Sequence, residues 1–194
     1  GGTWEVTNRW QCDPRWSFFS GHNLEGTACL WNKHRFPDNV TVEFFVGPKM
    51  DRERGSQYDY AADLNAVLSA DGADITSGYS FMLGGWDDSG SQVVRGKDVL
   101  KQNPKAIIPR QGSTHRRWFY VKARRDGERL TMWLDNKKVV ETVDKNPLSG
   151  DRMGLWTWKN GMMVAYVRIS ADTIASQTDL PLKPADAPPL TPYD

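Results

Sequence analysis

The sequence predicts an all-β fold, a two-sheet antiparallel β-sandwich, and three observations support this prediction. Short runs rich in β-branched and aromatic residues fill residues 117–170, and they recur about every 8–12 residues. Gly, Asn, Asp and Pro separate the runs, as expected for strands joined by turns. Apolar and polar residues alternate within several runs, which is typical of strands with one buried face. At 194 residues the chain suits one domain.

The N-terminal half contains the weaker strand signals. Predicted strands there are 4–11, 16–19, 26–33, 40–46, 62–69, 77–84 and 92–95. The charged segment 49–60 is predicted to be a long surface loop, and segment 97–116 has room for one edge strand.

The C-terminal half contains the stronger signals. Predicted strands are 117–123, 128–134, 137–143, 152–158 and 162–170, with turns at 124–127, 135–136, 144–150 and 159–161. Residues 173–177 are predicted to make one helical turn. We therefore expect a single β-sandwich domain over 1–178 and a Pro-rich extended tail or linker over 179–194.

Composition excludes some classes of partner. The net charge of +1 gives no overall electrostatic reason to bind nucleic acid. No apolar run approaches the roughly 20 residues that a membrane-spanning helix needs. Cys12 and Cys29 have no second pair that would complete a metal knuckle, so they form either a disulfide or two separate buried thiols. A disulfide and nine Trp residues together predict a secreted or periplasmic protein.

Strand alternation predicts a polar and aromatic outer face. The rows that are poor in aliphatic residues contain Trp133, Trp156, Trp158, Asp63 and Asn65. Sugar rings present C–H patches that stack on indole, while Asp and Asn side chains bond hydroxyl groups, so this set predicts a carbohydrate platform. The alternative is that the Trp residues cover the second sheet face beneath loops.

Trp86 follows Gly84-Gly85 in a loop with Asp87-Asp88, and it is either a further ligand contact or a loop anchor.

Motifs for catalysis and metal binding are sparse. The sequence has no nucleophile elbow, no phosphate-binding loop and no zinc-protease helix, and its three His residues are scattered. Asp51, Glu53, Asp59 and Asp63 offer hard oxygen ligands for Ca²⁺, but their spacing is not that of an EF-hand, and a solvated charged loop is the favoured interpretation. No cofactor is predicted with certainty, and the metal and the oligomeric state stay open.

Several segments also resemble a known family. The stretches are Cys29-Leu-Trp-Asn-Lys-His-Arg-Phe36 with Val40-Thr-Val-Glu-Phe44, Ser77-Gly-Tyr-Ser-Phe-Met-Leu83, Arg117-Trp-Phe-Tyr-Val-Lys-Ala-Arg124 with Leu130-Thr-Met-Trp-Leu-Asp-Asn-Lys137, and Pro147-Leu-Ser-Gly-Asp-Arg-Met-Gly-Leu155 with Tyr166-Val-Arg-Ile169. Their order resembles a concanavalin A-like jelly roll and, more narrowly, the 3-keto-disaccharide hydrolase domain of secreted bacterial proteins. The resemblance covers roughly residues 30–170 and is carried mostly by structural motifs.

The resemblance implies a carbohydrate-active domain, with an oligo- or polysaccharide as its partner, that cleaves a glycosidic bond beside an oxidised sugar ring. Elimination at such a ring needs a base, an acid and a group that polarises the ketone. The predicted catalytic residues are His34, Asp63, Tyr79 and Arg95. The predicted substrate-binding residues are Trp31, Lys33, Asn65, Trp86, Trp133, Trp156 and Trp158. Two other functions compete with a glycoside hydrolase: a non-catalytic, lectin-like carbohydrate-binding module, and a structural or protein-interaction domain.

Overall fold

The computed structural model describes residues 3–6, 19–48, 62–85, 89–108 and 117–181. In this part of the chain every strand pairing is antiparallel, and the short 3₁₀ turn η2 (Ile75–Ser77) is the only helical element whose bounds both lie within it. None of its helices is long and apolar enough to cross a membrane. The predicted all-β class is therefore confirmed.

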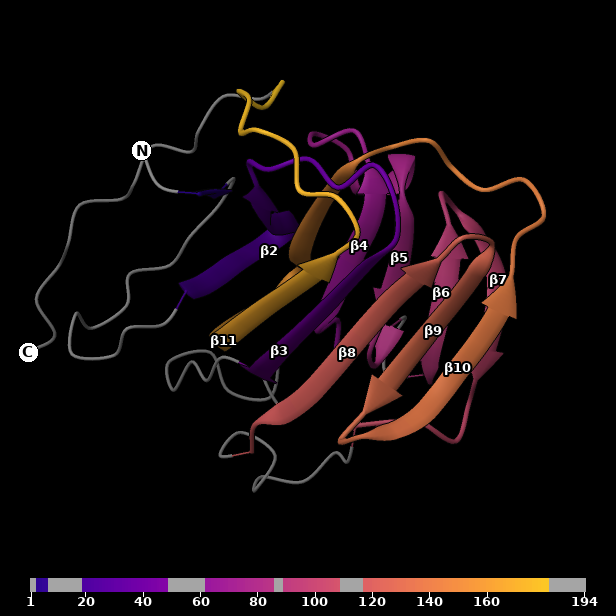
Figure 1. The fold of residues 1–194 in the computed structure, drawn as a ribbon. Coiled ribbons are helices and arrows are strands. Elements are labelled where there is room, and N and C mark those ends of the chain that lie inside the picture. The colour runs from indigo at the N-terminus through magenta and orange to yellow at the C-terminus, as the bar shows by residue number, and fades with distance from the viewer. Residues whose placement is uncertain (1–2, 7–18, 49–61, 86–88, 109–116, 182–194) are drawn as a thin grey trace, which may run out of the picture.

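The strands form two packed layers, which are visible in Figure 1. The front sheet contains β10 (Lys137–Val143), β9 (Arg129–Leu134), β8 (Phe119–Asp126) and β3 (Val40–Pro48), paired in that order. The back sheet contains β4 (Asn65–Ala70), β5 (Tyr79–Met82), β6 (Ser91–Arg95) and β7 (Asp98–Asn103). Successive strands are neighbours within each layer, apart from the step from β3 to β8.

The long strand β11 (Arg152–Ala171) joins the two layers. Its first half pairs with β4, and its second half pairs with β3. β2 (Phe19–Asn32) runs beside β11 over most of its length, and β1 (Trp4–Val6) pairs with the C-terminal end of β2. A single strand shared by two sheets makes the sandwich continuous along one side.

The core lies between the layers. It consists of the inward rows of both sheets, such as Phe44, Val121 and Met132 from the front sheet and Leu68 and Phe81 from the back sheet, all fully buried. Because side chains alternate along a strand, the residues between them face outward, so each sheet also has an outer face. These two outer faces differ strongly in the side chains that they carry.

A second, smaller apolar cluster lies outside the core, on the outer face of the back sheet. It contains Cys29, Trp31, Val67, Ala70, Met82, Val94 and Trp156, with Ile75 and Leu180 packed against it. These residues come from β2, β4, β5, β6 and β11. A sheet face exposed only to water would not collect this many buried apolar side chains, so this face is partly covered and partly hollowed.

The structure corrects two predicted details. The turn predicted at 159–161 is a bulge within β11, where Lys159 adopts φ +47° and the pairing register with β2 shifts between Trp158 and Asn160. The helical turn predicted at 173–177 is instead extended, with a β-bridge between Ala175 and Arg35. In both places pairing with a neighbouring segment keeps the backbone extended, although the local residues favour a turn.

Other predicted features are found or lie outside the described residues. Segment 97–116 does contain an edge strand, β7. The turn at 135–136 is a tight hairpin in which Asp135 and Asn136 adopt φ +49° and +65°, the geometry that two-residue hairpins prefer. The predicted strand 16–19 falls almost wholly outside the described residues, as do the loop 49–60 and most of the tail.

Candidate functional site

A groove of about 440 Å³ opens on the outer face of the back sheet. Its lining residues come from β5, β6 and β11, from the segment just before β4 and from two turns: Asp63, Ile75, Thr76, Ser80, Met82, Val94, Gly96, Lys97, Trp156 and Trp158. The groove is mainly apolar with a few polar groups. Its volume lies within the range of about 300–1,000 Å³ that is usual for small-molecule sites.

The two indoles of the groove stand on alternate positions of one strand. Trp156 and Trp158 both point outward from β11, with the inward-facing Leu155 completely buried. Trp156 is 4% exposed, whereas Trp158 is 45% exposed and has the Lys159 ammonium 5.8 Å from its ring centroid. Strand geometry therefore gives the groove one enclosed indole and one open indole.

Asp63 is held rigidly at the groove by buried amides. The residue adopts φ +56°, which is uncommon for a non-glycine residue, and its N–H donates to the Gly84 carbonyl. The Asn65 Nδ2 lies 3.3 Å from the Asp63 carboxylate, and the Asn65 Oδ1 accepts from the Leu83 N–H. Asn65 is fully buried, so it contributes by positioning Asp63 and the neighbouring backbone.

Asn160 supports the same corner from β11. Its Nδ2 donates to the Ala62 carbonyl at 2.6 Å, and the residue is 7% exposed. This bond ties the segment before β4 to the strand that carries both indoles. The structure thus brings Asp63, Trp156 and Trp158 together on one face of the back sheet.

Tyr79 and Arg95, two predicted catalytic residues, lie elsewhere, on the inward row of the back sheet. The Tyr79 hydroxyl donates to Asp144 Oδ2 at 2.7 Å and accepts from the Leu148 N–H, and Arg95 Nη1 lies 2.8 Å from the same oxygen of Asp144. Burial, reinforced by the bond to Asp144, raises the pKa of Tyr79 to about 12. This cluster anchors the connection 144–150 to β5 and β6.

Burial opposes ionisation of Asp144, but its partners outweigh burial. The hydrogen bonds from Tyr79 and the Asn146 N–H, together with the charge of Arg95, lower the pKa of Asp144 below its ordinary value. The Asp144 carboxylate therefore accepts its hydrogen bonds from groups of the fold itself. The arrangement resembles a structural clamp more closely than a reactive site.

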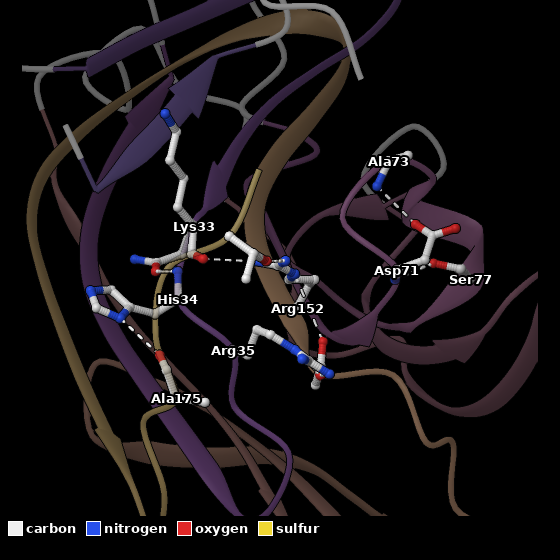
Figure 2. Close-up of polar contacts among 11 residues, drawn as sticks. Lys33, His34, Arg35, Asp71, Ala73, Ser77, Arg152 and Ala175 are labelled. Carbon is white, nitrogen blue, oxygen red and sulfur yellow. Dashed lines mark hydrogen bonds and ion pairs between the residues drawn. The ribbon is translucent and has the colours of Figure 1, made fainter. Parts of the chain in front are cut away.

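His34 and Lys33 lie at the other end of the back sheet, beside the C-terminal segment (Figure 2). His34 Nδ1 is 3.1 Å from the Ala175 carbonyl, and Lys33 Nζ pairs with Glu5 at 3.1 Å. The Lys33 carbonyl accepts from Arg152 Nη1 at 2.6 Å. The four predicted catalytic residues thus occupy three separate places: His34 at this edge, Asp63 at the groove, and Tyr79 with Arg95 at Asp144.

Trp133 and Trp31 also differ from the predicted common platform. Trp133 points outward from β9, on the front sheet, with Lys122 Nζ 5.1 Å from its ring centroid. Trp31 is on the groove side of the molecule but fully buried, in the small cluster with Cys29. Alternation gave Trp133 its correct row, but it did not say which sheet its strand joins.

Some predicted residues lie outside the described part of the chain. Trp86, Cys12 and three of the Ca²⁺ candidates, Asp51, Glu53 and Asp59, are among them. Cys29 is buried, at 2% exposure, on the outer face of the back sheet. The disulfide therefore stays a prediction, and no group of three or more metal-binding side chains occurs among the residues that are described.

The sequence did not single out several groove residues. Ser80 and Met82 alternate with the buried Tyr79 and Phe81, so their outward direction was readable from the pattern. Lys97 and Thr76, in contrast, reach the groove from turns, and nothing in the local sequence places a turn over a sheet face. Asp144 likewise gave no signal, because its two partners lie 65 and 49 residues away.

Comparison with known proteins supports the fold and leaves the family open. No family model matches the chain, and no curated protein matches it. Among solved structures, the carbohydrate-binding module CBM66 from Bacillus subtilis aligns with TM-score 0.63 and 17% identity over 87% of this chain and 96% of that one.

Two other solved structures give the same picture. A protein of unknown function with a galectin-like fold, also from Bacillus subtilis, aligns with TM-score 0.63 and 11% identity over 86% of this chain and 88% of that one. The exoplasmic/lumenal domain of VIP36 in a Ca²⁺- and mannose-bound form aligns with TM-score 0.59 and 9% identity, over 99% and 92%. The chain therefore has the galectin-like, concanavalin A-like β-sandwich fold, and the narrower hydrolase type is not confirmed.

Proposed function

We propose that this protein is a carbohydrate-binding, lectin-like β-sandwich that holds a glycan in the groove on the outer face of its back sheet. The observation that carries the proposal is the arrangement of Trp156, Trp158 and Asp63 around one groove. An indole offers an apolar face to sugar C–H groups, and a carboxylate accepts hydrogen bonds from sugar hydroxyls. The proteins of similar fold include a carbohydrate-binding module and a mannose-bound domain, which supports this class of ligand.

Each groove residue has a part in this proposal. Trp158, which is nearly half exposed, stacks on a sugar ring, and Trp156 closes the floor. Asp63 bonds hydroxyl groups from a fixed position, because buried amides hold its backbone and side chain. Lys97 and Thr76 contribute polar contacts from the rim. A rigid site of this kind loses little conformational freedom on binding, which favours affinity.

Binding without cleavage is the version that the geometry favours. Glycoside cleavage requires at least two ionisable groups within reach of one bond. Among the described residues the predicted catalytic set is divided between three places, and Tyr79 and Arg95 are engaged with Asp144. Incubation with the glycans that bind should therefore leave them intact, as judged by mass spectrometry of the sugars.

The test of the proposal is a matched pair of substitutions. Trp158→Ala removes the exposed indole of the groove, and Tyr166→Ala removes a similarly exposed ring, 51% against 45%, from the front sheet. Isothermal titration with soluble gluco- and manno-oligosaccharides should show a loss of about 2 kcal/mol, roughly 30-fold in Kd, for Trp158→Ala only. Equal loss in both variants, or binding by neither the wild type nor the variants, would refute the proposal.

Two further features belong to the same proposal. We place the protein outside the cytoplasm, where a disulfide between Cys12 and Cys29 would persist. Alkylation with and without reductant distinguishes a disulfide from two thiols by the mass change.

We also propose that any Ca²⁺ requirement involves Asp63 with the carboxylates of 51–59, and glycan binding in the presence of a chelator tests it.

A further inference from the structure

Three indoles form a line on the outer face of the back sheet. Trp31 is the cross-strand partner of Gly154, and Trp156 and Trp158 follow Gly154 on alternate positions of β11. We call Trp31, Trp156 and Trp158 the indole stripe. Four residues of β11 separate its ends, which corresponds to about 13 Å at a rise of ~3.3 Å per residue. Of the stripe, Trp156 and Trp158 line the groove, and Trp31 lies beyond its lining.

Gly154 is what allows the stripe to be continuous. A Cβ atom at this position would lie 2.9 Å from Trp31 Cε3 and 2.9 Å from Cys29 Sγ, closer than real Cβ atoms approach their neighbours. The Trp31 ring therefore lies across the backbone of β11, next in line to Trp156. A glycine whose missing side chain makes room for an indole is a specific feature of this face.

Exposure rises steadily along the stripe. Trp31 is 0% exposed, Trp156 is 4% exposed and Trp158 is 45% exposed. Trp31 Nε1 and Trp156 Nε1 are both buried donors with no partner among the described residues. A buried donor without a partner costs about 1–3 kcal/mol, so two in a row at one face indicate a surface suited to an acceptor that the described fold does not provide.

The C-terminal segment packs against the small cluster to which the buried end of the stripe belongs. Leu180 packs against the small cluster that contains Trp31 and Trp156, and its Cδ2 would lie 2.9 Å from a Cβ at Gly72. Upstream of Leu180, the segment is fixed along residues 33–39. The Thr178 N–H donates to the Lys33 carbonyl at 3.1 Å, and the Ala175 N–H donates to the Arg35 carbonyl at 2.9 Å.

A buried arginine fastens this segment (Figure 2). Arg152, 6% exposed, donates from Nη1 to the Lys33 carbonyl and from Nη2 to Thr178 Oγ1. The neighbouring Arg35 pairs with Asp151, 2.5 Å away. These bonds hold residues 172–178 firmly, and they leave Leu180 at the point where the segment reaches the small cluster.

We propose that residues 172–181 act as a strap that covers the Trp31 end of the indole stripe and so sets the length of the glycan that the groove accepts. The inference rests on the proposed function, since the ligand is the same glycan. With the strap in place, sugar units contact Trp158 and Trp156 and meet a closed end. Without Leu180, the surface extends to Trp31, and two indole N–H donors become available to sugar oxygens.

The experiment uses the full-length chain with Leu180→Ala and a matched control, Ile174→Ala. Ile174 belongs to the same strap but is 55% exposed and is not part of the small cluster. Oxidation with N-bromosuccinimide followed by peptide mass spectrometry reports which indoles are accessible. We expect Trp31 and Trp156 to react several-fold faster in Leu180→Ala than in the wild type, and at the wild-type rate in Ile174→Ala.

A second measurement concerns glycan length. Titration with gluco- and manno-oligosaccharides of increasing length should show a wild-type affinity that stops rising at short chains. In Leu180→Ala the affinity should continue to rise with longer chains. Unchanged Trp31 reactivity in Leu180→Ala would overturn the strap, whether or not a glycan binds. Wild-type binding with an unchanged length limit in Leu180→Ala would overturn the length-setting role alone, and no binding by the wild type would refute the proposed function itself.

Discussion

The two outer faces of the sandwich carry similar numbers of aromatic side chains but use them differently. On the front sheet, Tyr166, Phe45 and Tyr120 are direct cross-strand neighbours, with ring centroids 6.3 and 5.3 Å apart. On the back sheet, Trp156 and Trp158 follow one another on β11 and line a groove, and Trp31 lies beside them on β2. The front face is flat and self-paired, whereas the back face is hollow.

The polar and charged side chains of the two faces differ in a similar way. The row next to the front aromatic residues consists of Arg168, Glu43, Lys122 and Trp133, in cross-strand order, and its members contact one another or the aromatic row. Glu43 accepts from the Tyr120 hydroxyl and lies 3.6 Å from Arg168, and Lys122 lies over Trp133. On the front face these polar groups thus contact one another, whereas at the groove Trp156 Nε1 has no hydrogen-bond partner among the described residues. Small-molecule sites combine a mostly apolar hollow with a few polar groups, and this combination is why we propose the glycan site on the back face.

The largest expected difference between the faces concerns stability. Trp156→Ala removes a nearly buried indole and should lower the free energy of unfolding by about 3–5 kcal/mol. Tyr166→Ala removes a half-exposed ring and should cost less than about 1 kcal/mol. Urea denaturation followed by circular dichroism measures both values. Similar losses would mean that the groove floor is no better packed than the opposite face.

A second substitution tests the assignment of Tyr79 to the interior and to neither face. Tyr79→Phe removes a buried hydroxyl that serves both Asp144 and the Leu148 N–H, so the free energy of unfolding should fall by about 1–3 kcal/mol. Glycan affinity should stay at the wild-type value, since the hydroxyl does not border the groove. A variant that folds with normal stability but loses binding or activity would return Tyr79 to the list of functional residues.

Two glycines offer a matched comparison of the faces. Gly154→Ala places a Cβ 2.9 Å from both Trp31 and Cys29, and it should destabilise the protein by about 1–3 kcal/mol. Gly47→Ala, beneath Trp118 on the front sheet, meets its nearest atom at 3.2 Å and the indole only at 3.6 Å, so its cost should be smaller. Thermal unfolding of the two variants side by side gives the ranking, and a reversed order would contradict the close packing of the indole stripe.

The smallest effect is expected at alkaline pH on the front face. Burial, reinforced by Glu43, raises the pKa of Tyr120 to about 12, above the value of about 10 in an unfolded chain. The folded state therefore keeps this proton longer, and the stabilisation is complete below pH ~10 and lost as the pH rises toward ~12. Tyr120→Phe should flatten this part of the stability profile, measured by urea denaturation from pH 9 to pH 11, without changing glycan binding at neutral pH. An unchanged profile would show that the Glu43 bond does not perturb Tyr120.

The sequence was sufficient for most of the fold, because strand alternation and turn residues are local signals. It placed Leu155 inward and Trp156 outward on the same strand, and it located the Asp135-Asn136 hairpin. It was wrong about residues 159–161, where pairing of β11 with β2 on both sides of a bulge keeps the strand running through a turn-like stretch.

The site was only partly predictable, because it depends on which strands join which sheet. Trp133 and Trp158 have the same sequence pattern, yet β9 belongs to the front sheet and the first half of β11 to the back sheet. Leu180 and Lys97 reach the back face from segments that no local pattern directs there. Local alternation thus predicts the direction in which a side chain points, whereas long-range strand pairing determines which residues lie beside it.

The most direct test of the contrast between the faces observes the indole N–H groups individually. Two-dimensional ¹⁵N NMR resolves the Trp side-chain resonances, and single Trp→Phe variants assign them. On titration with the tightest-binding oligosaccharide, the resonances of Trp156 and Trp158 should shift progressively, while that of Trp133 stays in place. A shift of Trp133 with Trp156 and Trp158 unmoved would place the ligand on the front sheet and contradict this account.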